Sequence, residues 1–267
     1  GLRTMSDCAF RGCTALTEIS IPDSVQFSEY TYYIFSGCTG LRSAKLPASS
    51  AVIPYEMFYG CSALTSVILP TNLTSISGSA FYGCAALREV ALPASVTTIG
   101  SYAFCGCTVL KDVELPAGIE TIGSYAFSNC SALKTMCGLS RIEQIDNNAF
   151  QGCVALENIV LGQGFGKIGK EAFDGDTGLK SVLFCGGVPE VGSTSKYYVA
   201  FYGTKASARG YYLPLHAQEW AQAIDAGTGK WQGLTMIALP GPVLDEATYD
   251  EDENAINVKW HLTSALD

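Results

Sequence analysis

Residues 80–102 read AFYGCAALREVALPASVTTIGSY, and this stretch decides the fold because the chain repeats its pattern about eight times. A phenylalanine marks each copy, at steps of 23 residues after a first step of 25: Phe10, Phe35, Phe58, Phe81, Phe104, Phe127, Phe150 and Phe173. A cysteine follows three residues later in seven copies, from Cys13 to Cys153, and Asp176 takes its place in the eighth. A fixed period of this length is typical of solenoid proteins, in which each repeat forms one coil.

Each copy contains two segments that we expect to be extended. In L-x-x-V-x-L-P, the side chains of Leu87, Val90 and Leu92 face inward, and the last two alternate with the period of a strand. Pro93 ends this strand because it lacks an N–H group. The V-x-x-I segment predicts a second, shorter extended stretch, and A-F-x-G-C suits a tight turn or one helical turn. The pattern predicts a mainly β solenoid of short parallel strands stacked coil on coil.

The whole unit, A-F-x-G-C-x-x-L-x-x-V-x-L-P-x-x-V-x-x-I-G-x-x, resembles the BspA-like class of leucine-rich repeats, found on surface proteins of gut and oral bacteria and of some protozoan parasites. The resemblance covers residues 5–185, where eight copies share five positions. It implies a right-handed leucine-rich repeat solenoid, a non-enzymatic role in binding, and a location at the cell surface or outside the cell. The segment from Phe201, with Tyr211, Tyr212, Leu213 and Pro214, also resembles the terminal cap of that family.

The chain divides into three parts by pattern. Residues 1–185 carry the coils, and residues 186–240 lose the period, as expected for a C-terminal cap that covers the last coil. Pro214, Trp220 and Gly227 predict one cap helix of about ten residues, with the rest irregular. Residues 241–267 begin with an acidic linker and continue with Ile256, Val258 and Trp260 in strand alternation, either as a terminal strand or, as we favour, the start of a further β domain.

Composition limits what the chain binds. The net charge of −9 and the scattered Lys and Arg residues argue against nucleic acid, which requires clustered positive charge. No apolar run is long enough to span a membrane. We expect a monomer without cofactor or metal. G-x-G-x-x-G at residues 164–169 matches a nucleotide-binding motif, but the repeat register explains its Ile168 and Gly169.

No catalytic residue is predicted. The two histidines, His216 and His261, have neither the spacing of a zinc site nor the nucleophile motif of a hydrolase. The eleven cysteines can be buried thiols, disulfides or metal ligands. Buried thiols are favoured, because a free cysteine behaves as a small hydrophobic residue and identical directions in adjacent coils strain a disulfide.

Candidate binding residues occupy positions that the repeat leaves variable. On the outward face of the strands, Ile68 with Ala91, and Cys137 with Val160 and Leu183, predict apolar stripes. Tyrosines share positions in adjacent coils, and two pairs predict aromatic ledges: Tyr59 with Tyr82, and Tyr102 with Tyr125. These tyrosines can equally cover the turn side of the core.

Two functions remain open, and an accessory module of a carbohydrate-active enzyme is a distant third. The first is a surface-displayed or secreted adhesion module that binds a host or matrix protein or a glycan, as the resemblance implies. The second is a structural spacer that holds other domains away from the cell surface. The sequence does not identify the ligand.

Overall fold

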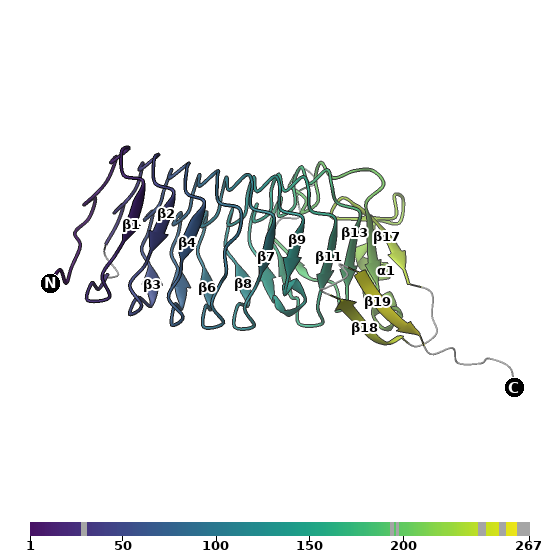
Figure 1. Cartoon of the computed structure of the whole chain (residues 1–267). Coiled ribbons are helices and arrows are strands. Elements are labelled where there is room, and N and C mark those ends of the chain that lie inside the picture. The colour runs from purple at the N-terminus through teal and green to yellow at the C-terminus, as the bar shows by residue number, and fades with distance from the viewer. Residues whose placement is uncertain (28–30, 193–194, 196–197, 240–243, 251–254, 261–267) are drawn as a thin grey trace, which may run out of the picture.

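The computed structural model describes residues 1–27, 31–192, 195, 198–239, 244–250 and 255–260. The repeats form an elongated stack of coils in which the N-terminal coil lies at one end and the cap at the other (Figure 1). Each coil has three sides, formed by the L-x-x-V-x-L segment, the V-x-x-I segment and the A-F-x-G-C segment. We call these the strand face, the second sheet and the turn face.

The strand face is built from parallel strands that pair in register with the next coil, as predicted. Its sheets are β1-β2-β4, then β7-β9, then one that begins with β11-β13 and continues into the cap. The bounds in the coils are β1 (Glu18–Ser20), β2 (Ser43–Lys45), β4 (Ser66–Ile68), β7 (Asp112–Glu114), β9 (Thr135–Cys137), β11 (Asn158–Leu161) and β13 (Ser181–Phe184). Two interruptions divide this face: the fourth coil keeps a single bridge between Glu89 and Asp112, and the 3-10 turn η1 (Leu139–Arg141) follows β9.

The V-x-x-I segments form one continuous sheet of seven short parallel strands, which confirms the second extended stretch. The strands are β3 (Val52–Ile53), β5 (Ser75–Ile76), β6 (Thr98–Ile99), β8 (Thr121–Ile122), β10 (Gln144–Ile145), β12 (Lys167–Ile168) and β14 (Glu190–Val191). Ile168 therefore sits in a repeat strand, which agrees with the register that explains the apparent nucleotide motif.

The turn face is hydrogen-bonded from coil to coil although it contains no strand. The Phe58 N–H donates to the Ala80 carbonyl, and the Phe81 N–H donates to the Ala103 carbonyl, at 2.9 and 2.8 Å. Within a coil, the Tyr82 N–H donates to the Ser79 carbonyl at 3.1 Å, which closes a β-turn. The A-F-x-G-C segment is therefore a pair of tight turns rather than a helical turn.

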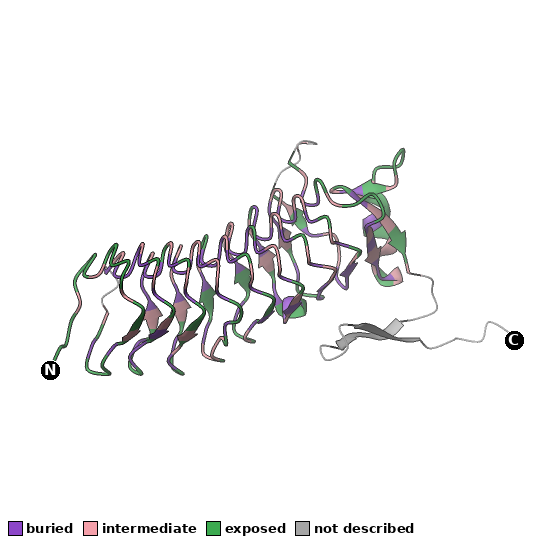
Figure 2. Ribbon diagram, turned by 45° about the horizontal axis from the view of Figure 1, so that its top comes forward, coloured by how far each residue is buried: buried purple, intermediate pink, exposed green. Residues whose placement is uncertain are grey.

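Buried residues recur in every coil along the stack (Figure 2). A column of phenylalanine rings forms the centre of the core. Rings of adjacent coils stack with centroids 5.1–5.7 Å apart and planes within 15° of parallel. From Phe35 to Phe173 these rings are fully buried, and Phe201 adds one further ring from the cap. Aromatic rings bury the largest apolar areas, so this column supplies much of the stabilisation of the stack.

The repeat cysteines form a second column beside the rings. All eleven cysteines are free thiols, and the repeat cysteines from Cys38 to Cys153 are buried, as predicted, whereas Cys137 on the strand face is half-buried. Each thiol from Cys38 onward donates a hydrogen bond to the phenylalanine carbonyl of the preceding coil, with Sγ–O distances of 3.0–3.3 Å. The cysteine is therefore retained as a small apolar residue that also satisfies a buried carbonyl.

The cap contains the predicted helix, and it also contains three strands that the sequence did not predict. Residues Pro214–His216 form the 3-10 turn η2 and lead into α1 (Ala217–Ala223), where Trp220 is fully buried. The strands β15 (Arg209–Tyr212), β16 (Lys230–Trp231) and β17 (Leu234–Ala238) continue the strand-face sheet. The cap therefore stacks a sheet on the last coil, and its helix is only one part of the cover.

After the cap, β18 (Leu244–Asp250) and β19 (Ala255–Trp260) pair as an antiparallel hairpin. The second strand matches the predicted alternation, but residues 244–250 form a strand where an acidic linker was expected. Acidic residues can occupy a strand when its partner satisfies the backbone. Whether this hairpin begins a further domain stays a prediction, and so do the boundaries at 185 and 240.

Candidate functional site

The predicted residues of the strand face divide into an exposed group and a buried group. Ile68 is 62% exposed and Ala91 is also exposed, so both are available to a ligand. Val160 and Leu183 are only 7% and 1% exposed, which corrects the expectation that they form an outward apolar stripe.

Neighbouring coils and the cap cause this burial. Leu183 lies between Val160 and Tyr211 in the paired strands β11, β13 and β15. Val160 and Leu183 form a small second core with Cys185 and Leu213, and Tyr211 packs against it. The apolar residues at the cap end of the strand face are therefore structural.

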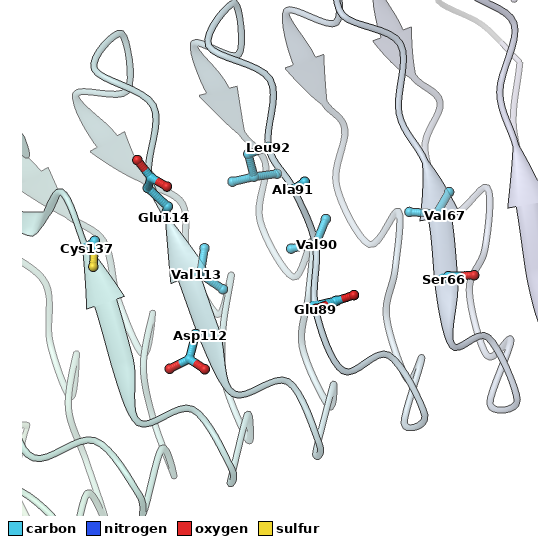
Figure 3. A pocket seen from close by; sticks show the side chains of 10 residues that line it. All are labelled: Ser66, Val67, Glu89, Val90, Ala91, Leu92, Asp112, Val113, Glu114 and Cys137. Carbon is cyan, nitrogen blue, oxygen red and sulfur yellow. The ribbon is translucent and has the colours of Figure 1, made fainter. Parts of the chain in front are cut away.

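A hollow of about 640 Å³ lies on the strand face at the first interruption of the sheet (Figure 3). It extends from Ser66 in β4, across the fourth coil, to Cys137 in β9. Ala91 is the small residue at an outward position of the fourth coil, next to the larger Glu114 of β7. The short side chain and the lapse in strand pairing together leave this space open.

Three carboxylates line the hollow: Glu89, Asp112 and Glu114. Glu89 and Asp112 stand directly opposite each other in the bridge between their coils, an arrangement that destabilises a sheet when the charges are alike. None of the three forms an ion pair with any residue that the structure describes. By contrast, Lys180 and Glu157 form an ion pair at 2.7 Å elsewhere on the chain. The hollow therefore holds negative charge without an ion-pair partner among the described residues.

The tyrosine pairs on the turn face stack as predicted. The rings of Tyr59 and Tyr82, and those of Tyr102 and Tyr125, are each 4.6 Å apart and within 4° of parallel. This separation matches the spacing of neighbouring strands, so each pair stacks along the solenoid axis. Tyr59 and Tyr102, the first members, are 37% and 38% exposed, and their partners are half-buried.

The two pairs lie close to each other around Cys105. The nearby Cys105 thiol raises the pKa of Tyr82, and burial and the phenols of Tyr59 and Tyr102 raise it further. Burial raises the pKa of the Cys105 thiol itself, although a hydrogen bond with Ser128 opposes this. At neutral pH these groups are neutral, so the tyrosine surface presents phenols and ring faces rather than charge.

Sequence reasoning missed Tyr55, Glu56 and Ser79, which lie next to these tyrosines on the turn face. Tyr55 is half exposed, and its ring lies over the turn of the next coil, where the Cε1 atom is 2.8 Å from the position that a Cβ on Gly78 would occupy. Glu56 and Ser79 hold the position two residues before the phenylalanine, where the backbone is left-handed, and the absence of glycine from that position was the only clue in the sequence. Tyr55 lies outside this position, and the repeat gave no signal for it.

Chemistry on the chain is limited by the environment of its thiols. Burial raises the pKa of Cys61 to about 12 and that of Cys185 to about 11, and it raises the pKa values of Cys84, Cys107 and Cys130 strongly. These thiols remain protonated and are poor nucleophiles.

Within the described ranges, no three His, Cys, Asp or Glu side chains converge on a metal-binding point. In the same ranges, no helix is long and apolar enough to cross a membrane.

The repeat matches a known family. The family described as BspA type Leucine rich repeat region matches in six copies, over residues 1–109 and 75–205. The chain belongs to the BspA-type leucine-rich repeat family. A search of curated proteins found no match.

Two solved structures support the fold of this BspA-type chain. A leucine-rich repeat protein from Bacteroides ovatus is 28% identical, with a TM-score of 0.65 over 88% of this chain and 64% of its own. The T. pallidum leucine-rich repeat protein is 31% identical, with a TM-score of 0.54 over 58% of this chain and 72% of its own. The chain thus spans just under two thirds of the Bacteroides ovatus protein.

Proposed function

We propose that this BspA-type solenoid is a non-enzymatic binding module, secreted or displayed at a cell surface, which recognises a host or matrix protein or a glycan. The observation that carries the proposal is the hollow between β4 and β9, where Glu89 and Asp112 face each other and neither forms an ion pair within the described part of the chain. A like-charge pair costs stability in the free protein, and a ligand with positive groups relieves it. This favours a ligand surface that carries lysine, arginine or amino groups.

The experiment is a binding screen with immobilised extracellular-matrix proteins and a glycan array, followed by titration in 50 and 300 mM salt. We expect at least one protein or glycan to bind, and its affinity to fall as salt screens the contact. The double variant Glu89→Gln with Asp112→Asn should weaken this binding about fivefold. Glu120→Gln is the control: it removes an exposed carboxylate that lies in the coil of Asp112 but outside the hollow, and it should leave binding unchanged.

Complete absence of binding in the screen would contradict the proposal and favour the spacer role. Binding whose affinity changes neither with salt nor in the double variant would support a binding module but would exclude the hollow as its binding site.

A further inference from the structure

One row of residues on the turn face keeps side chains where the backbone favours glycine. The residue two positions before the phenylalanine has a φ of 53–60° in eight coils, and none of the eight is glycine: Cys8, Tyr33, Glu56, Ser79, Tyr102, Tyr125, Asn148 and Glu171. A non-glycine residue in this left-handed region is strained, whereas glycine adopts it freely. The chain uses glycine for its other left-handed position, two residues after the phenylalanine, in every coil but that of Asn129. The retained strain points to a row whose side chains have a role.

Five turn-face residues meet around Ser79, and we call them the Ser79 site: Tyr55, Glu56, Ser79, Tyr82 and Tyr102. Glu56 and Tyr102 occupy the same row in the coils before and after Ser79, because the Glu56 N–H donates to the Gly78 carbonyl and the Ser79 N–H to the Ser101 carbonyl. Tyr82 lies across the β-turn from Ser79, and the Tyr55 ring lies over the adjacent Gly78.

The Ser79 site keeps groups open to a ligand, although the Tyr55 ring packs against Tyr32 and the Tyr82 ring stacks on Tyr59. One face of the Tyr102 ring stacks on Tyr125. On the other side of Tyr102, the same row holds the small Ser79, so no ring of this row covers the second face of Tyr102. The Ser79 hydroxyl and the Glu56 carboxylate make no hydrogen bond or ion pair with the described residues. Glu56 is partly buried, which raises its pKa, and the charge of Arg11 opposes this shift.

We infer that the Ser79 site binds a neutral saccharide. One face of a pyranose ring carries C–H groups that pack on an aromatic ring, and its hydroxyls both donate and accept hydrogen bonds. Tyr102 and Tyr55 offer aromatic surface, the Glu56 carboxylate only accepts, and the hydroxyls of Ser79 and Tyr82 do both. The inference rests on the proposal that the chain is a binding module, but it does not depend on the strand-face hollow.

The donor and acceptor pattern separates a saccharide from its rivals. A proline-rich peptide also docks on aromatic rings, but it offers mainly carbonyl acceptors, which the acceptor-only Glu56 cannot pair. A sulfated or carboxylated sugar is negatively charged, so the Glu56 carboxylate and the chain's net charge of −9 repel it. An alkylammonium ion suits tyrosine faces and a carboxylate, but Arg11 lies near enough to Glu56 to oppose its charge.

The test uses the whole chain and a panel of neutral oligomers of glucose, galactose and N-acetylglucosamine, titrated to 10 mM with NMR or calorimetric detection. Sulfated and sialylated oligomers and tetramethylammonium are titrated beside them. We expect at least one oligomer to bind. Tyr102→Ala should weaken it about tenfold, and Glu56→Gln about threefold. Tyr202→Ala, an exposed tyrosine of the cap, should change nothing. Thermal unfolding of each variant shows whether the fold is intact, and Tyr102→Phe keeps the ring should the alanine variant unfold.

Several outcomes would overturn the inference. These are no binding to any neutral oligomer at 10 mM, binding only to sulfated or sialylated sugars, binding only to tetramethylammonium, and unchanged affinity in both variants. The double variant in the hollow distinguishes this site from the strand-face proposal, because it should leave saccharide affinity unchanged. Saccharide binding that is lost in the hollow variant would place the sugar on the strand face and refute the Ser79 site.

Discussion

Replacing Asp176 with asparagine should stabilise the protein at neutral pH and leave it almost unchanged at pH 4. Asp176 takes the place of a cysteine in the thiol column and is fully buried. One carboxyl oxygen accepts a hydrogen bond from the Cys153 N–H at 2.7 Å, while the other has no partner among the described residues. The pattern of the other coils indicates what is missing, since each thiol donates to a phenylalanine carbonyl there. An ionised carboxylate cannot donate.

The pH dependence follows from the direction of the pKa shift. Burial raises the pKa of Asp176 well above its ordinary value, and the charge of Asp174 adds to this, while the Cys153 N–H opposes it. The folded state therefore holds a proton that the unfolded state releases above about pH 4. The contribution of this group to stability is full below pH 4 and is lost as the pH rises towards the raised value.

The magnitude is set by the cost of protonation. A carboxyl with an ordinary pKa of about 3.9 binds a proton at pH 7 at a cost of about 4 kcal/mol, which is an upper limit for this group. Asparagine avoids this cost, and its amide can donate to the Phe150 carbonyl while its oxygen accepts from Cys153. We expect a gain of about 2 to 4 kcal/mol at pH 7 and less than about 1 kcal/mol at pH 4.

Urea unfolding at pH 4, 5.5 and 7, followed by circular dichroism, measures this gain. Asp176→Cys restores the thiol and should show the same pH trend, whereas the exposed Glu120→Gln should show no gain at any pH. A variant Asp176→Asn that is no more stable than the original at pH 7, or whose gain is the same at pH 4, would refute the reasoning.

Three further results are expected. Phe104→Ala should destabilise the chain by about 3–5 kcal/mol, and Phe10→Ala by much less because Phe10 is only partly buried; equal losses in urea unfolding would contradict the role of the ring column. In the native protein only Cys8 and Cys13 should react quickly with a thiol reagent, and all eleven cysteines should react in denaturant, with fewer than nine arguing for disulfides. Gly83→Ala should cost about 1–2 kcal/mol, since Gly83 has a φ of 69°; a neutral result in the same assay would show that the turn relaxes.

The repeat predicted the coils because each conserved position has one physical role. The phenylalanine fills the centre, the leucine and valine fill the strand side, and the cysteine satisfies a carbonyl, so spacing alone located the core. The same argument predicted the stacked tyrosine pairs, because equal positions in adjacent coils must lie side by side. Their role in binding stays a prediction.

Features outside the repeat were not predictable in this way. The cap strands have no period, so nothing in the sequence indicated that Tyr211 would pair beside Leu183 and that Leu213 would help to bury it. The lapse of strand pairing at Ala91 depends on backbone geometry between two coils whose sequences still fit the pattern. The left-handed row became visible only when the dihedral angles were known, although the absence of glycine from it was a clue.

The thiol column also allows the number of unfolded coils at one end of the stack to be counted. Cys13, in the first coil of the described stack, is exposed, and each later thiol of the column donates to a carbonyl of the coil before it. In a stack whose coils contact only their neighbours, opening proceeds from an end one coil at a time. Each coil that opens at the N-terminal end releases one more reactive cysteine. A brief pulse of an alkylating reagent would record, as discrete mass steps in single chains, how many coils were open at that moment.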